Sequence, residues 1–201
     1  SNEDPEFLYK MGMRYLNGDR VMNDEEKGFR LLSCSNSNQR MSNKISQYFV
    51  EQSDGIEWKE DGEIEWGFDE RNGRLIVKGK GPLEDYGDGS KTCKMKEYKW
   101  NKKPPWRMKY EEQIKSAVIC HGVSSIGKYA FKDCTNLRSV ALPISVTTIE
   151  DYSFKRCHRL VSVTITNSVS SIGDCAFCEC WDLRLVALPN SVTSKIGRAH
   201  V

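Results

Sequence analysis

The sequence of 201 residues lacks a long hydrophobic run, a marked charge excess and an abundance of histidine. No apolar run approaches the roughly 18 residues that a membrane-spanning helix needs, so we expect no membrane insertion by this segment. Thirty basic residues face 28 acidic ones, whereas nucleic-acid-binding domains usually carry a clear basic excess. This balance argues against a dedicated nucleic-acid binder.

Sequence signatures of enzymes are also missing. The chain has no Walker loop, no GxGxxG motif and no HExxH motif. No serine or cysteine motif marks His121 or His158 as the base beside a nucleophile. We therefore expect no enzymatic activity, no catalytic residue and no cofactor in this chain.

Asn-x-Ser/Thr glycosylation sequons are absent as well. A glycosylated surface protein of this length often contains one, so their absence favours a cytoplasmic location, with the cell surface as the alternative. The first residues lack the order of a secretory signal and an initiator methionine, and we expect the chain to begin inside a longer protein.

A repeat of 23 residues organises the second half of the chain from Ile114 onward. Leu137, Leu160 and Leu183 open successive blocks, and a valine follows three positions after each of them. Alternating apolar residues at the start of a block predict one strand, and the Ser-Val-x-x-Ile stretch predicts a second, shorter one. One block is too small to fold alone, so the blocks are expected to stack as a solenoid.

The blocks resemble the BspA-type leucine-rich repeat, whose units follow the pattern L-x-S-V-x-I-P-N-S-V-T-S-I-G-x-x-A-F-x-x-C-x-x. The similarity covers residues 114–194, with departures at Glu150, Ser153 and Thr166 that affect local turns. It implies a mainly β repeat solenoid of period 23, preceded here by a short α-helical repeat. BspA-type proteins are often surface adhesins, so the resemblance implies adhesion or scaffolding through contact with another protein.

A helical pattern occupies residues 7–32, where apolar residues on both sides of the turn at 17–19 predict two short helices. Gly12, Tyr15 and Gly18 belong to a pattern that resembles a Sel-one-like repeat, a helical pair whose relatives act as adaptors. A partial successor is expected over residues 41–49. We expect residues 1–50 to form this partial helical array, which is either loosely held or the last piece of an array that lies upstream.

Residues 51–113 are expected to form a linker and an N-terminal β cap. The turn at Asn72 and Gly73 and the two tryptophans Trp66 and Trp106 resemble the segment that precedes BspA-type repeats. A hairpin that carries both tryptophans would cover the open end of the first repeat.

The solenoid is expected over residues 114–194 and beyond, because the array stops in the middle of a block. The last seven residues, KIGRAHV at 195–201, break the register at Lys195. A nucleotide sequence that encodes them matches the start of a common sequencing adapter. We therefore expect an artefactual tail, and an array that continues in the full-length protein.

Most of the cysteines follow the repeat. Cys134, Cys157 and Cys180 lie 23 residues apart, which indicates an inward structural ladder in preference to disulfides. Cys175, Cys178 and Cys180 are spaced closely enough to share a zinc ion, but a tetrahedral site needs a fourth ligand and none stands at a familiar spacing. We expect no metal site.

One stretch, residues 91–110, mixes lysines with Tyr98, Trp100 and Trp106, a composition that can stack bases and neutralise phosphates. No recognisable nucleic-acid-binding fold surrounds it, so we expect no nucleic-acid partner.

The outward side chains of the strands are the predicted binding surface. In each opening strand these positions, which include Val118, are expected to face solvent and to contact a partner protein. They are Lys115, Ser116, Arg138, Ser139, Ala141, Val161, Ser162, Thr164, Arg184, Leu185 and Ala187. The turn side with Lys155, Arg156 and His158 is the competing surface. As an alternative function, the chain is a regulatory or substrate-recruiting segment of a larger enzyme such as a kinase.

Overall fold

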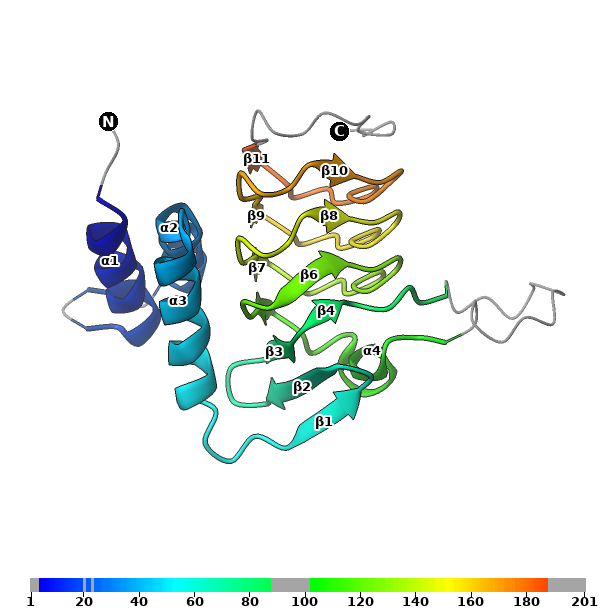
Figure 1. The fold of residues 1–201 in the computed structure, drawn as a ribbon, viewed down its shortest axis with the longest axis horizontal. Helices are drawn as coiled ribbons and strands as arrows, with labels where there is room; N and C mark the ends of the chain where they lie inside the picture. The colour runs from blue at the N-terminus through cyan, green and yellow to red at the C-terminus, as the bar shows by residue number, and fades with distance from the viewer. Residues whose placement is uncertain (1–3, 20, 23, 88–101, 188–201) are drawn as a thin grey trace, which may run out of the picture.

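The computed structural model of the chain describes residues 4–19, 21–22, 24–87 and 102–187. Figure 1 shows a layer of helices beside a stack of strands, with further strands and a short helix closing one end of the stack. Two predicted features, the tail at 195–201 and most of the basic aromatic stretch, lie outside the described residues.

The N-terminal layer contains three helices: α1 (Pro5–Asn17), α2 (Glu25–Ser35) and α3 (Gln39–Glu51). Asp4 caps the start of α1 by accepting a hydrogen bond from the Glu6 N–H, and Gly18 ends the helix in the left-handed conformation. Gly12 and Gly28 let α1 and α2 approach closely, because a Cβ at Gly28 would lie 2.8 Å from Leu16. The two expected helices are therefore present, and α3 includes residues 41–49, where the partial successor was expected.

Two sheets carry the rest of the chain. The large sheet has the order β1-β2-β3-β5-β7-β9-β11 and the small sheet the order β10-β8-β6-β4. The elements are β1 (Trp58–Asp61), β2 (Ile64–Asp69), β3 (Arg74–Gly79), β4 (Gly81–Pro82), α4 (Pro105–Tyr110), β5 (Ser116–Ile119), β6 (Val123–Ile126), β7 (Ser139–Ala141), β8 (Thr148–Ile149), β9 (Ser162–Thr164), β10 (Ser171–Ile172) and β11 (Leu185–Ala187).

The strands of the repeats pair in parallel at the 23-residue period. Val140 lies opposite Val163, and Val163 lies opposite Val186. Each complete block contributes one strand to the large sheet and one to the small sheet, and the interior between the two sheets holds the apolar ladder. The predicted repeat solenoid is confirmed.

Phenylalanine and cysteine ladders run along this interior. The ring centroids of Phe131 and Phe154 lie 5.1 Å apart, and those of Phe154 and Phe177 lie 5.3 Å apart. The Cys157 thiol donates to the Phe131 carbonyl at 3.1 Å. All seven cysteines among the described residues are free thiols.

The cap continues the large sheet. Strands β1, β2 and β3 are antiparallel, and β3 then pairs in parallel with β5 of the first repeat. Gly73 has a φ of +64° in the turn that joins β2 to β3. Trp66 and Trp106 are buried edge to face with centroids 6.1 Å apart, and the Trp106 indole donates to the Ala130 carbonyl at 3.0 Å. The tryptophan pair thus lies against the first repeat.

Candidate binding surface

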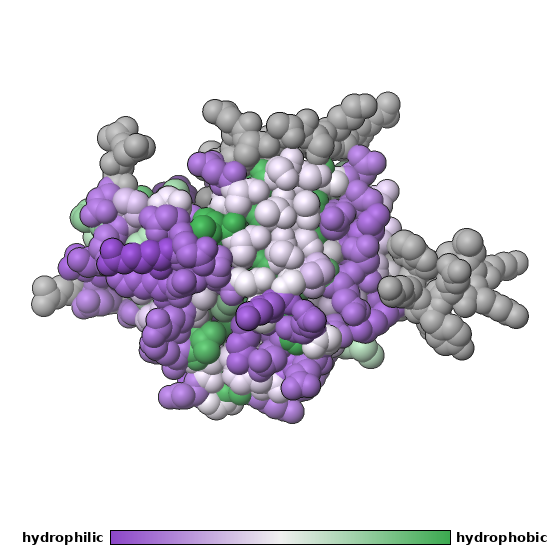
Figure 2. Space-filling view, viewed as in Figure 1, coloured by the Kyte–Doolittle hydropathy of each residue, from purple (hydrophilic) through white to green (hydrophobic). Residues whose placement is uncertain are grey.

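The outward face of the large sheet is covered by the N-terminal helices, which lie along it in Figure 1. Four apolar side chains of α2 and α3 form one buried cluster with four outward side chains of the sheet. Three of these lie on β3, β5 and β7, and the fourth belongs to Cys120, just after β5. The members are Phe29, Leu32, Ile45, Phe49, Ile76, Val118, Cys120 and Ala141, none more than 5% exposed. Figure 2 shows the outside of the helical layer as mainly hydrophilic, with small hydrophobic patches at its junction with the solenoid.

A charged cluster fastens the start of α2 to the sheet. The Glu25 carboxylate accepts a hydrogen bond from Arg74 Nη2 at 2.6 Å and from the Ser116 hydroxyl at 3.1 Å. The Arg74 guanidinium also lies 5.5 Å from the ring centroid of Phe29 and 5.2 Å from that of Phe49. One arginine of the sheet therefore contacts both helices that cover it.

Three polar side chains of the helical segment satisfy backbone groups that follow the repeat strands. The Asn36 amide donates to the Leu142 carbonyl at 2.7 Å, and the Ser46 hydroxyl accepts from the His121 N–H at 2.7 Å. The Ser42 hydroxyl accepts from the Ile144 N–H at 3.3 Å. The helical layer is therefore part of the packed structure, where the sequence predicted a loosely held end.

This arrangement corrects the predicted binding face. Ser116, Ser139, Ala141 and Val118 are buried, so the prediction that they face solvent is wrong. The physical reason is that the apolar side chains of α2 and α3 are buried against this face of the sheet. In this structure these four side chains are buried within the chain itself.

Other predicted residues stay accessible. Lys115, Arg138 and Arg184 are exposed, and Val161 and Ser162 are half-buried. Thr164 lies on β9, and Leu185 and Ala187 lie on β11. Their side chains are outside the described part of the structure.

The accessible residues form a row at the start of successive strands. The Arg138 N–H donates to the Lys115 carbonyl at 2.8 Å, the Val161 N–H to the Arg138 carbonyl at 2.9 Å, and the Arg184 N–H to the Val161 carbonyl at 3.1 Å. These bonds hold neighbouring members about 4.8 Å apart, the spacing of paired strands. The row presents three cations and one valine at regular intervals.

An exposed tryptophan lies close to the end of this row. Trp181 is 73% exposed and stacks on His158, with ring centroids 4.1 Å apart and planes 1° apart. It precedes Arg184 by three residues. Sequence reasoning missed Trp181, although a large aromatic residue at a repeat position held by Thr135 and His158 in earlier blocks was a usable signal. We call Lys115, Arg138, Val161, Trp181 and Arg184 the strand-start edge.

The competing turn side differs in its charge pairing. Arg156 lies 3.2 Å from an Asp133 oxygen and 3.7 Å from a Glu179 oxygen, and Lys155 lies 3.5 Å from Glu179. Within the described part of the chain, the three cations of the strand-start edge make no ion pair. The strand-start edge therefore keeps charges that a partner can neutralise.

The structure gives the three closely spaced cysteines two different environments. Cys180 donates its thiol to the Phe154 carbonyl at 3.1 Å, whereas Cys175 and Cys178 lie in the turn before it. No group of three or more His, Cys, Asp or Glu side chains in the described ranges is arranged to hold a metal ion. Among the same residues, no helix is long and apolar enough to cross a membrane.

Comparisons with known proteins address the repeat region. Residues 108–199 match the family model of the BspA type leucine rich repeat region, in six copies. No curated protein matches the chain significantly.

Among solved structures, a leucine-rich repeat protein from Eubacterium ventriosum is 25% identical over 57% of this chain and 27% of its own, with a TM-score of 0.47. A leucine-rich repeat protein from Bacteroides ovatus is 26% identical over 69% of this chain and 37% of its own, with a TM-score of 0.43. A leucine rich cell surface protein from Faecalibacterium prausnitzii is 24% identical over 70% of this chain and 45% of its own, with a TM-score of 0.35. The chain spans less than half the length of these three proteins.

Proposed function

Because residues 108–199 are a BspA-type leucine-rich repeat region, we propose that this chain is a non-catalytic protein-binding module that serves in adhesion or as a scaffold. Its partner is another protein, and the contact surface is the strand-start edge. The observation that carries the proposal is the regular row of cations, which form no ion pair with any residue that the structure describes, beside the exposed Trp181.

The covered sheet face supports a binding role for the solenoid in general. Its outward side chains already hold a helical layer through buried contacts at Val118 and Ala141, so the face accepts apolar protein surface. Since that area is occupied by α2 and α3, an external partner has to use what remains accessible. Of the predicted residues whose side chains the structure describes, Lys115, Arg138 and Arg184 are the exposed ones.

The chemistry of the edge indicates the kind of partner. Tryptophan and arginine are over-represented among the residues that dominate the energy of protein interfaces, and Trp181 and Arg184 stand three residues apart. Three exposed cations in a row favour an acidic segment, both in encounter rate and in orientation. A partner with acidic side chains spaced along one strand and an apolar group opposite Trp181 fits this edge.

The test compares matched variants of the full chain. A protein captured by the wild type is identified, and its affinity is then measured by titration against Arg138→Glu/Arg184→Glu and against Trp181→Ala. We expect each variant to bind about tenfold more weakly or worse, with unchanged far-ultraviolet circular dichroism, because exposed charges contribute little to folding.

The matched control is Lys155→Glu/Arg156→Glu on the turn side, which should retain the wild-type affinity. Loss of binding in this control, with binding retained in both edge variants, would assign the partner to the turn side and overturn the proposal.

A further inference from the structure

The turn of the third block that contains Cys175 and Cys178 differs in sequence from the same turn in the first two blocks. Tyr129 and Tyr152 occupy equivalent positions in the first two blocks and stack with ring centroids 5.1 Å apart. In the third block Cys175 takes this place, and Cys178 takes the place of a lysine, Lys155 in the second block. The inward cysteine of the ladder is the separate residue Cys180.

The backbone brings these two cysteines together. The Cys178 N–H donates to the Cys175 carbonyl at 3.2 Å, which closes a four-residue turn. The ends of such a turn lie within about 7 Å, and disulfides join Cα atoms about 4.4 to 6.8 Å apart. The two thiols are also hydrogen-bonded to each other. A disulfide can therefore form with little movement of the chain.

The repeat holds this turn in place independently of the thiols. Cys175 has a φ of +53°, close to the +58° of Tyr129 and the +57° of Tyr152. The Arg156 N–H donates to the Cys178 carbonyl at 2.8 Å, so the preceding block fixes the position of Cys178. The proximity of the two sulfurs is thus a property of the folded solenoid.

The two thiols differ in accessibility. Cys175 is half-buried, whereas Cys178 is 8% exposed. Burial, followed by the hydrogen bond with Cys175, raises the pKa of Cys178 to about 12. Since the thiolate is the reactive form, an external reagent reaches Cys175 first.

We infer that Cys175 and Cys178 form a reversible thiol oxidation site that is oxidised by small-molecule disulfides. The Cys175 thiolate attacks one sulfur of the small disulfide, which forms a mixed disulfide and releases one thiolate. Cys178 loses its proton to water and attacks the Cys175 sulfur, which forms the Cys175–Cys178 bond and releases the second thiolate. Two protein thiols are oxidised and one small disulfide is reduced to two thiols.

The test treats the folded full chain with oxidised glutathione, quenches with acid and maps every cysteine by peptide mass spectrometry. We expect the peptide with Cys175 and Cys178 to be lighter by two hydrogen atoms and to carry no glutathione. The exposed free thiol of Cys34 should retain the glutathione adduct and so report that the reagent is active. A reducing agent should restore both cysteines.

Two matched variants separate the steps. Cys178→Ser should trap glutathione on Cys175, and Cys175→Ser should leave Cys178 unmodified because it is buried. The proposal is overturned if wild-type Cys175 retains the glutathione adduct, if the pair stays reduced while Cys34 is fully modified, or if the new bond joins Cys178 to Cys180. The wild-type map decides the question even if a variant fails to fold.

Discussion

The repeat solenoid and the helical layer are packed through different kinds of contact. In the solenoid every block repeats the contacts of the one before it, as the stack of Phe131, Phe154 and Phe177 shows. The helical layer has no such repetition and depends on one patch of sheet, where Phe29 and Leu32 lie among outward side chains of the strands. Regular contacts make the solenoid cooperative from block to block, whereas the helices depend on a surface that the solenoid must first provide.

The largest expected effect tests the solenoid side of this comparison. Phe154→Ala removes a fully buried ring between two stacked neighbours and should lower the free energy of unfolding by about 3–5 kcal/mol. Urea unfolding followed by circular dichroism measures the change. Phe7→Ala, at a ring that is 54% exposed on α1, is the matched control and should change stability by less than about 0.5 kcal/mol.

A second substitution tests the helical side. Leu32→Ala empties a fully buried position of α2 and should cost about 2–4 kcal/mol. Hydrogen exchange should show that α1, α2 and α3 lose protection while β7 and β9 retain theirs, because the strands keep their ladder partners. An equal loss of protection in β7 and β9 would show that the two regions unfold as one unit.

Much of the solenoid was predictable because its contacts recur at a fixed separation in sequence. The period that aligns Leu137 with Leu160 also aligns the paired strands, so register and core followed from a single pattern. The covering of the sheet was not predictable in this way, since Glu25 meets Ser116 across 91 positions without any periodic relation. Two signals were present: a helical apolar stripe without an assigned partner, and the apolar Val118 at an outward position.

The charged fastening of the helices should have a smaller effect. Glu25→Gln removes the charge that Arg74 and Ser116 contact but keeps an amide oxygen as acceptor. We expect a loss of about 1 kcal/mol, less than the roughly 1.5–3 kcal/mol of a hydrogen bond to a charged group, because the amide oxygen still accepts. The loss should be confined to exchange protection of the helices, and an effect on β9 of the same size would contradict the comparison.

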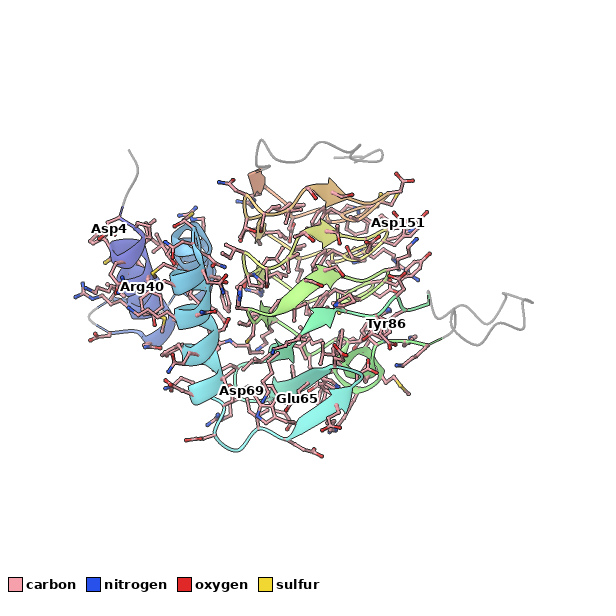
Figure 3. The ribbon with its side chains drawn as sticks, viewed as in Figure 1. Asp4, Arg40, Glu65, Asp69, Tyr86 and Asp151 are labelled. Atoms are coloured by element: carbon pink, nitrogen blue, oxygen red, sulfur yellow. The ribbon has the colours of Figure 1, made fainter. Side chains whose placement is uncertain are left out.

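The smallest expected effect concerns acid stability on the far side of the solenoid, where Figure 3 shows Asp151 away from the helices. The hydrogen bond from Lys128, 2.9 Å away, lowers the pKa of Asp151 below its ordinary value of 3.8 despite partial burial. A lowered pKa in the folded state stabilises the fold above pH 3.8, and this contribution is lost as the pH falls through the lower folded value. In Asp151→Asn the free energy of unfolding should therefore fall less steeply as the pH drops below 3.8, with a difference from the wild type of less than about 1 kcal/mol.

The covering of the sheet by the helical layer is tested most directly by the reactivity of Cys120. This thiol lies at the outward face beside Val118, is 2% exposed, and has a pKa raised to about 12 by burial. In native buffer we expect an alkylating reagent to modify Cys34 quickly and to spare both Cys120 and the interior Cys134. As urea is raised, Cys120 should become reactive before Cys134, because the helices leave the sheet before the solenoid opens. Alkylation of Cys120 in native buffer at the rate of Cys34 would contradict the account.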